Sequence, residues 1–258
     1  MGSIIVTTVA GGVLAGFVGA MMGLGGGIVA VPFLNLVVGI PMHYAAAAGL
    51  ISTLSVSCGA AGRYLRRGGL VDIRLAFQVE LFAAAGGLVG GITVGWLAGP
   101  VLQILFAATM LYGALHMVRT ARREPKSDVS GSPVSGGRRL LAYGLCFFAG
   151  VLSGLLGIGG GIVVVPVLHL VLALPFKSAT ATSNFMMGLT AVPALCGYVF
   201  RNQLDLTVAG PLAAGVLLGA MLGARLMPSV RTPVLKFIFA AVLLVVAAEM
   251  ARKGLAAC

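Results

Sequence analysis

The same twelve-residue motif occurs twice in this chain, each time within a strongly apolar region. Residues 23–34 read GLGGGIVAVPFL and residues 157–168 read GIGGGIVVVPVL, with nine of twelve positions identical at an offset of 134 residues. Further matches follow at nearly the same offset: Pro41 with Pro175, Tyr64 with Tyr198, and PVLQILFAA at 100–108 with PVLKFIFAA at 233–241. The sequence therefore predicts two homologous halves that build one architecture twice.

Long apolar segments follow one another along the whole chain. Of its 258 residues, 59% are hydrophobic and only 9% are charged, whereas about a quarter are charged in a soluble domain. Several segments reach the roughly 20 residues that cross a hydrocarbon core of about 30 Å. We predict an all-α polytopic membrane protein with eight to ten membrane segments, at about 4–22, 28–40, 44–62, 75–98, 101–118, 140–156, 162–175, 178–200, 206–227 and 233–250.

The basic residues are concentrated between apolar segments. Ten of the 17 Lys and Arg residues fall into two clusters, Arg63, Arg66, Arg67 and Arg74, then Arg119, Arg122, Arg123, Lys126, Arg138 and Arg139. Two long crossings separate the clusters, so both lie on one side, which the positive-inside rule makes cytoplasmic. The net charge of +11 therefore indicates contact with anionic membrane lipids and not with nucleic acid.

A polar linker divides the chain nearly in half. We predict a first transmembrane repeat at 1–118, a cytoplasmic linker rich in Ser, Gly, Pro and charge at 119–139, and a second transmembrane repeat at 140–258. The short segments 28–40 and 162–175 decide the topology. If each counts as a crossing, each half has five, and an odd number gives inverted repeats. We favour this arrangement, with both termini outside; four crossings per half would give parallel repeats.

The glycine triplets predict a break in the helix. Gly25, Gly26 and Gly27, with Gly159, Gly160 and Gly161 in the second copy, each cost about 1 kcal/mol of helix stability relative to Ala. Pro32 and Pro166 follow five residues later and cannot donate a backbone hydrogen bond. We expect a helix that ends, a glycine turn and a new short helix, either broken or re-entrant.

Broken helices at matching positions of two repeats are typical of a transporter's binding site. The N-terminus of the new helix presents N–H groups and roughly half a positive charge, so it can bind an anion without Lys or Arg. All six triplet glycines are therefore predicted to bind substrate. The motif also fits a loose dinucleotide pattern, but no strand–helix unit or acidic partner surrounds it, and no phosphate-loop Lys follows it.

Close helix packing is the role that we favour for Gly19, Gly23, Ser153 and Gly157. Gly19, Gly23 and Gly27, and Ser153, Gly157 and Gly161, recur every four residues, as do Gly87, Gly91 and Gly95, which align with Gly215, Gly219 and Gly223. Small residues at this spacing let membrane helices approach closely.

A few polar residues inside apolar segments complete the candidate site. Ser183, Asn184 and Thr190 in the second half and Ser52 in the first can line an anion path, or can simply join helices by hydrogen bonds. Glu80 lies about two turns into segment 75–98 and is the candidate for proton coupling, because an ionisable residue within the membrane is a functional candidate. Arg225 can attract an anion or snorkel, and the histidines near the short segments, His43 and His169, are assigned structural roles.

Nothing in the sequence indicates an enzyme. There is no paired carboxylate, nucleophile motif or His/Cys cluster, and the four cysteines lack metal-ligand spacing. We therefore expect no catalytic residues, no metal and no cofactor. The expected partners are a small anion and membrane lipids, and homo-oligomerisation is left open.

The twin motif, followed in the second half by ATATSNFMMGLTAVPA, resembles the sulfite exporter TauE/SafE family over nearly the whole chain. In that family the first-half counterpart usually carries a Thr-Ser pair, whereas AAAAGLIS here does not. The resemblance implies transport of sulfite, sulfoacetate or another small organic anion across a bacterial plasma membrane. We expect an exporter of a small sulfur-containing anion; an uptake permease for another organic anion and an anion channel are the alternatives.

Overall fold

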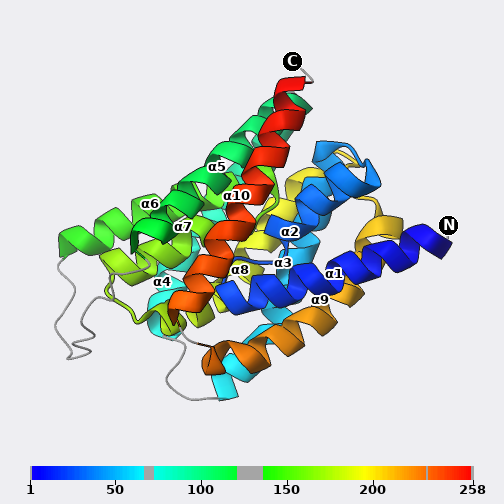
Figure 1. The fold of residues 1–258 in the computed structure, drawn as a ribbon. Coiled ribbons are helices and arrows are strands. Elements are labelled where there is room, and N and C mark those ends of the chain that lie inside the picture. Colours follow the sequence, from blue (N-terminus) through cyan, green and yellow to red (C-terminus); the bar gives the residue numbers. More distant parts are fainter. Residues whose placement is uncertain (1, 67–72, 121–135, 231, 257–258) are drawn as a thin grey trace.

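The computed structural model describes residues 2–66, 73–120, 136–230 and 232–256, and within these ranges the regular structure is entirely helical (Figure 1). Each half contributes four long helices and one short helix. The bounds are α1 Gly2–Met22, α2 Gly27–Pro32, α3 Met42–Arg66, α4 Ile73–Thr93, α5 Gly99–Thr120, α6 Gly136–Leu156, α7 Gly161–Pro166, α8 Phe176–Phe200, α9 Leu206–Leu226 and α10 Thr232–Ala256.

The predicted segments correspond closely to these helices. Six helices of the described chain are long and apolar enough to span a membrane: α1, α3, α4, α6, α8 and α9. Their outward faces carry large apolar side chains, among them Leu81 (71% exposed) and Phe148 (66%). A soluble protein rarely exposes apolar surface so widely, so these faces fit a lipid environment and the chain is a multi-pass membrane protein.

The predicted linker is shortened at both ends by helix. α5 continues to Thr120 and α6 begins at Gly136. Residues 121–135, which include Arg122, Arg123 and Lys126, lie outside the described residues, as does Arg67 of the first basic cluster. The division into repeats at 118 and 140 stays a prediction.

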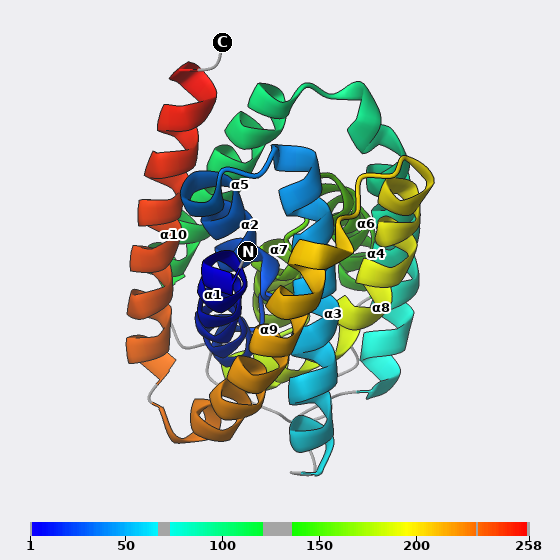
Figure 2. The ribbon, with the colours of Figure 1, turned by 90° about the vertical axis from the view of Figure 1, so that its right-hand side faces the viewer.

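The two halves interlock. α1 packs most extensively against α9, and its counterpart α6 packs against α4, the counterpart of α9. Two further pairs, α3 with α8 and α5 with α10, join equivalent helices across the centre (Figures 1 and 2). Each half therefore buries its helices chiefly against the other half.

Equivalent helices run antiparallel where they meet. On α5 and α10, Gly113 lies against Leu243 and Ile104 lies against Gly254, so residue numbers rise in opposite directions along the pair. Figure 2 shows the same opposition for α3, which descends from blue to cyan, and α8, which ascends to yellow. A twofold axis across the helices produces this pattern, which is compatible with the predicted inverted repeats.

Glycine contacts correct the predicted alignment of α4 with α9. A Cβ on Gly150 would lie 2.0 Å from the carbonyl oxygen of Ala83, and a Cβ on Gly16 would lie 2.0 Å from that of Val216. Gly16 and Gly150 are equivalent at the 134-residue offset, so Ala83 corresponds to Val216, at an offset of 133. The predicted alignment of Gly87 with Gly215 was therefore wrong by five residues, since Gly87 corresponds to Ala220. The error arose because glycines that recur every four residues can be aligned in more than one register.

A side-chain cap marks the start of α9. The Asp205 carboxylate accepts hydrogen bonds from the Thr207 backbone N–H at 2.9 Å and from the Thr207 hydroxyl at 2.6 Å. The cap satisfies a helix N–H group that has no intrahelical partner. These bonds hold the pKa of Asp205 below its ordinary value.

Candidate functional site

Each long first helix of a repeat ends at a glycine turn, as predicted. Turn 1, Gly23–Gly27 by our definition, joins α1 to α2, and turn 2, Gly157–Gly161, joins α6 to α7. Each short helix then passes into a π-helical segment, η1 (Phe33–Val38) after Pro32 and η3 (Val167–Val171) after Pro166. The proline removes a helical hydrogen bond, and the wider π-helical turn follows directly. π-helical segments are frequent at functional sites.

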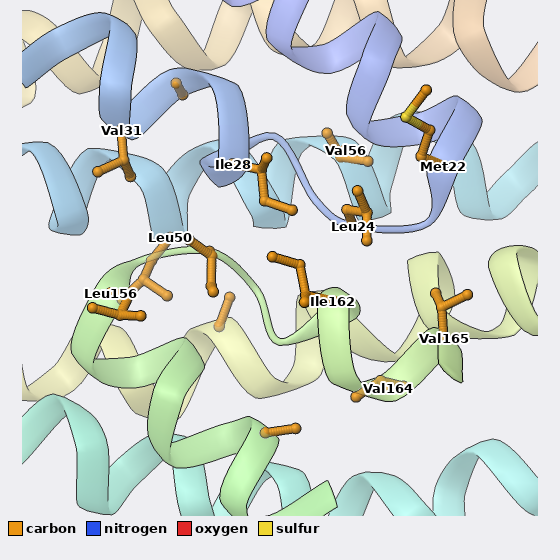
Figure 3. Packing of buried hydrophobic residues seen from close by; sticks show 14 of the residues in the cluster. Met22, Leu24, Ile28, Val31, Leu50, Val56, Leu156, Ile162, Val164 and Val165 are labelled. Carbon is orange, nitrogen blue, oxygen red and sulfur yellow. The ribbon is translucent and has the colours of Figure 1, made fainter. Parts of the chain in front are cut away.

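The two turns touch at the centre of the molecule, which we call the crossing. A Cβ on Gly27 would lie 2.0 Å from the Gly157 carbonyl oxygen, and a Cβ on Gly161 would lie 2.3 Å from the Gly23 carbonyl oxygen. These two glycines are thus required by the approach of one backbone to the other. Figure 3 shows the crossing, with Leu24 and Ile28 on one side and Ile162 on the other.

The crossing is closed to solvent in this structure. Leu24 is 0% exposed, and Ile28, Ile158 and Ile162 are each 1% exposed. The side chains of Ser52, Thr53, Thr180, Ser183 and Asn184 lie around the same turns and are 0% exposed. The centre therefore combines an apolar seal with buried hydroxyl and amide groups.

Side-chain hydrogen bonds hold the ends of α1 and α6. The Asn184 amide and the Tyr64 hydroxyl each donate to the Ala20 carbonyl oxygen at 2.8 Å, and Ser183 donates to the Gly23 carbonyl oxygen at 2.8 Å. In the second half Tyr198 donates to the Gly154 carbonyl oxygen at 2.8 Å. The matched tyrosines thus play the same role in both halves. Each donates a hydrogen bond to a carbonyl at a helix end, which has no intrahelical donor.

Several buried polar atoms near the turns have no hydrogen-bond partner. They are Ser52 Oγ, Ser153 Oγ, Thr180 Oγ1 and Asn184 Oδ1. Buried polar groups are nearly always hydrogen-bonded, and an unpartnered one costs about 1–3 kcal/mol. The unpartnered atoms on α3 and α8, which are those of Ser52, Thr180 and Asn184, are candidates for contact with a bound ligand.

The structure divides the predicted site residues into two groups. The six triplet glycines, with Ser52, Ser183 and Asn184, lie at the crossing. Thr190 does not, because it lies six residues beyond Asn184 on α8, about 9 Å along the helix. It donates instead to Glu80 Oε1 on α4, at 2.5 Å. The substrate-binding role of all these residues stays a prediction.

Glu80 is buried between helices, as its place in segment 75–98 predicted. Its side chain is 4% exposed, and its Oε2 has no hydrogen-bond partner. α6 contributes Cys146 near this carboxyl group, and α8 contributes the Thr190 hydroxyl. At the structurally matched positions the other half has Ala213, Gly12 and Val56, so this group occurs once.

Sequence reasoning missed a duplicated polar contact beyond each short helix. Asn35 donates to the Ile40 carbonyl oxygen at 2.9 Å, and the His169 ring contacts the Leu174 carbonyl oxygen at 2.8 Å. The 134-residue offset pairs Asn35 with His169 and Ile40 with Leu174, so the motif alignment, continued further, could have found this contact. It gives His169 the structural role that we predicted.

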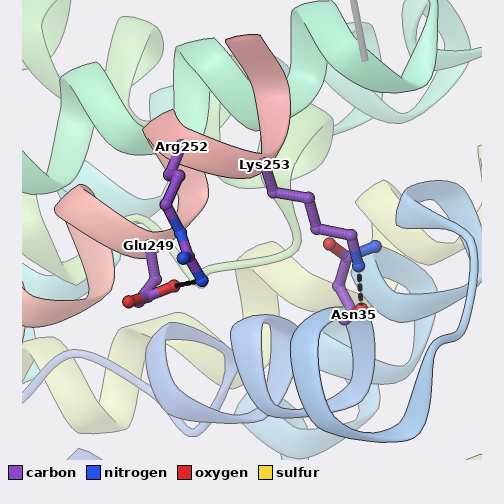
Figure 4. Close-up of polar contacts among 4 residues, drawn as sticks. All are labelled: Asn35, Glu249, Arg252 and Lys253. Carbon is purple, nitrogen blue, oxygen red and sulfur yellow. Dashed lines mark hydrogen bonds and ion pairs between the residues drawn. The ribbon is translucent and has the colours of Figure 1, made fainter. Parts of the chain in front are cut away.

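Asn35 also joins the ends of α5 and α10. Gln103 donates to Asn35 Oδ1 at 3.0 Å, and Lys253 donates to the Asn35 carbonyl oxygen (Figure 4). Arg252 pairs with Glu249 at 2.8 Å beside a cavity of about 420 Å³. His43 contacts the Leu97 carbonyl oxygen at 3.0 Å, in line with a structural role, and Arg225 is exposed.

The described residues contain no group of three or more His, Cys, Asp or Glu side chains that could hold a metal ion. The chemistry available at the crossing is that of neutral hydroxyl and amide groups and backbone N–H groups. Such groups can hold and release a small anion, and they include no nucleophile–base arrangement.

Comparison with known proteins agrees with this chemistry. A family model described as "Sulfite exporter TauE/SafE" matches residues 8–250. The chain is 25% identical to the probable membrane transporter protein YunE of Bacillus subtilis, over 95% of this chain and 96% of that protein. It is 30% identical to a probable membrane transporter protein of Xylella fastidiosa, over 87% of this chain and 85% of that protein. No solved structure matches the chain significantly.

Proposed function

The chain belongs to the sulfite exporter TauE/SafE family, and from this premise we propose that it exports sulfite or an organosulfonate such as sulfoacetate across the bacterial plasma membrane. That it is a membrane transporter and not an enzyme follows from the family and its relatives. The cargo, the direction and the membrane are our proposal. They rest on the family description and on a site without fixed charges.

One observation carries the proposal. Two duplicated glycine turns meet at the buried centre, where uncharged donors surround them. The first intrahelical bonds of α2 and α7 go to the Gly26 and Gly160 carbonyls, so the N–H groups of the triplets lie at the helix starts. We propose that these N–H groups, with Ser52, Ser183 and Asn184, bind the anion.

The closed crossing favours a carrier over an open channel. Its apolar side chains are at most 1% exposed, so an anion reaches the polar groups only after one side opens. In repeat-built transporters, one bundle rocks against the other around a fixed site. The antiparallel pairs of equivalent helices would allow a matching motion toward either face.

We further propose that Glu80 couples transport to protons. Among the residues that the structure describes, it is the one acidic side chain buried within a candidate span, and its Oε2 lacks a partner. Thr190 donates a hydrogen bond to the other oxygen at 2.5 Å. This bond supports a role for Thr190 in proton coupling and not in direct contact with the anion at the crossing. Intramembrane carboxyl groups commonly form proton relays in transporters.

Counterflow in liposomes tests the proposal. Vesicles loaded with unlabelled sulfite should take up labelled sulfite in a saturable manner, and sulfoacetate should compete. Uptake that does not saturate would identify a channel. Saturable uptake of carboxylates without competition by sulfite or sulfonates would support the permease alternative and reject the sulfur-anion proposal.

A further inference from the structure

The two turns share a sequence but have different polar surroundings. At turn 1, Gly23 lies against Thr180, Gly25 against Thr53, and Gly26 against Ser52. Ser183 donates to Gly23 and Asn184 donates to Ala20, just before the turn. The polar groups therefore come to turn 1 from α3 of its own half and from α8 of the other half.

Turn 2 lacks this lining. At the equivalent positions Thr180 is replaced by Ala46, Ser183 by Gly49, Asn184 by Leu50, Ser52 by Met186 and Thr53 by Met187. Gly157 lies against Ala46, and both Gly159 and Gly161 lie against the Met187 sulfur. Thr53 lies between the two turns, because it contacts Gly159 of turn 2 as closely as Gly25 of turn 1.

The polar lining of turn 1 includes two hydroxyl groups without hydrogen-bond partners. Ser52 Oγ and Thr180 Oγ1 are fully buried hydroxyl groups without partners. Ser52 contacts Gly26 through its Cβ, and Thr180 contacts Gly23 through its backbone and its methyl group. The two residues therefore flank the same turn from two helices. Two free donors at one backbone turn suit an oxyanion, because a hydrogen bond to a charged group is stronger than one between neutral groups.

Resting on the proposed function, we infer that the protein holds a single oxyanion against turn 1, bound by the hydroxyl groups of Ser52 and Thr180, and that turn 2 serves as a structural support. The Asn184 amide nitrogen is committed to Ala20, which orients the side chain, and its Oδ1 has no partner. Oδ1 is an acceptor, so it suits the hydroxyl of a protonated oxyanion such as hydrogen sulfite.

Ser153 supplies a matched control. It is a fully buried serine with an unpartnered hydroxyl group, and it lies beside the middle glycine of turn 2, Gly160, as Ser52 lies beside Gly26. A single-turn site predicts that the two serines differ in their effect on binding, whereas a two-turn site predicts that they are alike.

The experiment is calorimetric titration of the purified wild-type protein and three variants with sodium sulfite. We expect one anion per chain, binding about tenfold weaker in Ser52→Ala and in Thr180→Val, and unchanged affinity in Ser153→Ala. Thr180→Val keeps the branched shape, and melting temperatures show whether each variant is folded.

Two results would overturn the single site while leaving the proposed function intact: two anions bound per chain, or equal losses from Ser52→Ala and Ser153→Ala. Unchanged affinity in both Ser52→Ala and Thr180→Val would do the same. If the folded wild-type protein bound neither sulfite nor sulfoacetate and showed no counterflow of either, the proposed function would fail and the inference with it.

Discussion

Turn 1 and turn 2 have the same GxGGGIV sequence and most of the same backbone path, yet they differ at one residue. Gly26 has φ −70° and ψ −21°, a right-handed helical conformation, whereas Gly160 has φ 71° and ψ −10°. Because the local sequences match, the difference arises from the tertiary surroundings, which are more polar around turn 1 and include the Met187 sulfur at turn 2. The duplicated turns have thus kept the crossing while their surroundings and one backbone conformation differ.

The largest effects are expected where the two turns touch and the halves are still equivalent. Gly27→Ala and Gly161→Ala each place a Cβ within 2.3 Å of a backbone oxygen, which cannot be relieved by a side-chain rotation. We expect each variant to lose more than about 3 kcal/mol of stability, the upper range for overpacking, and to accumulate poorly. Detergent-solubilised yield and thermal unfolding measure this loss.

Gly144→Ala is the control for these two variants, since a Cβ there meets nothing within 4 Å. We expect normal yield from it. If Gly161→Ala were tolerated and Gly27→Ala were not, the two turns would differ in packing as well as in lining.

Substitutions of the middle glycines, Gly26 and Gly160, should affect sulfite affinity and protein stability to different extents. In Gly26→Ala the helical φ suits Ala, but the new Cβ lies 3.0 Å from the Ser52 Cβ. We expect sulfite affinity to fall at least about tenfold, near 1.4 kcal/mol, with an unchanged melting temperature.

In Gly160→Ala the left-handed conformation costs about 1–2 kcal/mol, so stability falls and affinity should fall less. Gly160→Asn should recover part of the stability, because Asn adopts this conformation more readily. Binding and melting curves on the same preparations test both variants; equal affinity losses from Gly26→Ala and Gly160→Ala would argue that both turns bind the anion.

The two halves also differ away from the crossing, because the residue equivalent to Glu80 in the second half is Ala213. Glu80→Gln keeps the size and the hydrogen bond from Thr190 but cannot release a proton. We expect transport to become nearly independent of pH, with folding preserved. Glu249→Gln, at an exposed carboxylate paired with Arg252, is the control and should keep the wild-type pH profile. A normal profile in Glu80→Gln would remove it from the mechanism.

The linker has no duplicate and should matter least. Replacing residues 124–135 with a Gly/Ser sequence leaves α5 and α6 intact. We expect transport within about twofold of wild type, because flexible linkers chiefly set the reach between their ends. Initial rates in vesicles, normalised to inserted protein, provide the measurement. Inactivity of correctly inserted protein would assign this segment a function.

Much of the fold could be predicted because membrane helices are marked by their own composition. The helix ends at Met22 and Leu156, the turns and the short helices all follow from local glycine and proline chemistry. The partners of each helix could not be predicted in this way. Periodic glycines in α4 fit α9 in two registers, and only the contacts of Ala83 and Val216 select one.

Only those parts of the site that stand out locally in the sequence could be predicted. The triplets, Ser52, Ser183 and Asn184 were found because they stand out in apolar segments. Thr190 was grouped with Asn184 because they share a segment, although the helix carries it about 9 Å further along. The unequal lining of the turns was missed because it depends on side chains from α3 and α8 that are brought together only by the fold.

The interlocking of the halves has a consequence for how the chain is made. α1 leaves the ribosome about 200 residues before α9, against which it packs. The first five helices are therefore inserted before their partners from the second half are made. Until then their close-packing glycines, such as Gly12 and Gly16, face lipid or other proteins. The packing of α1 is therefore completed only when α9 has been inserted, so a chain truncated before α9 leaves α1 without its main partner.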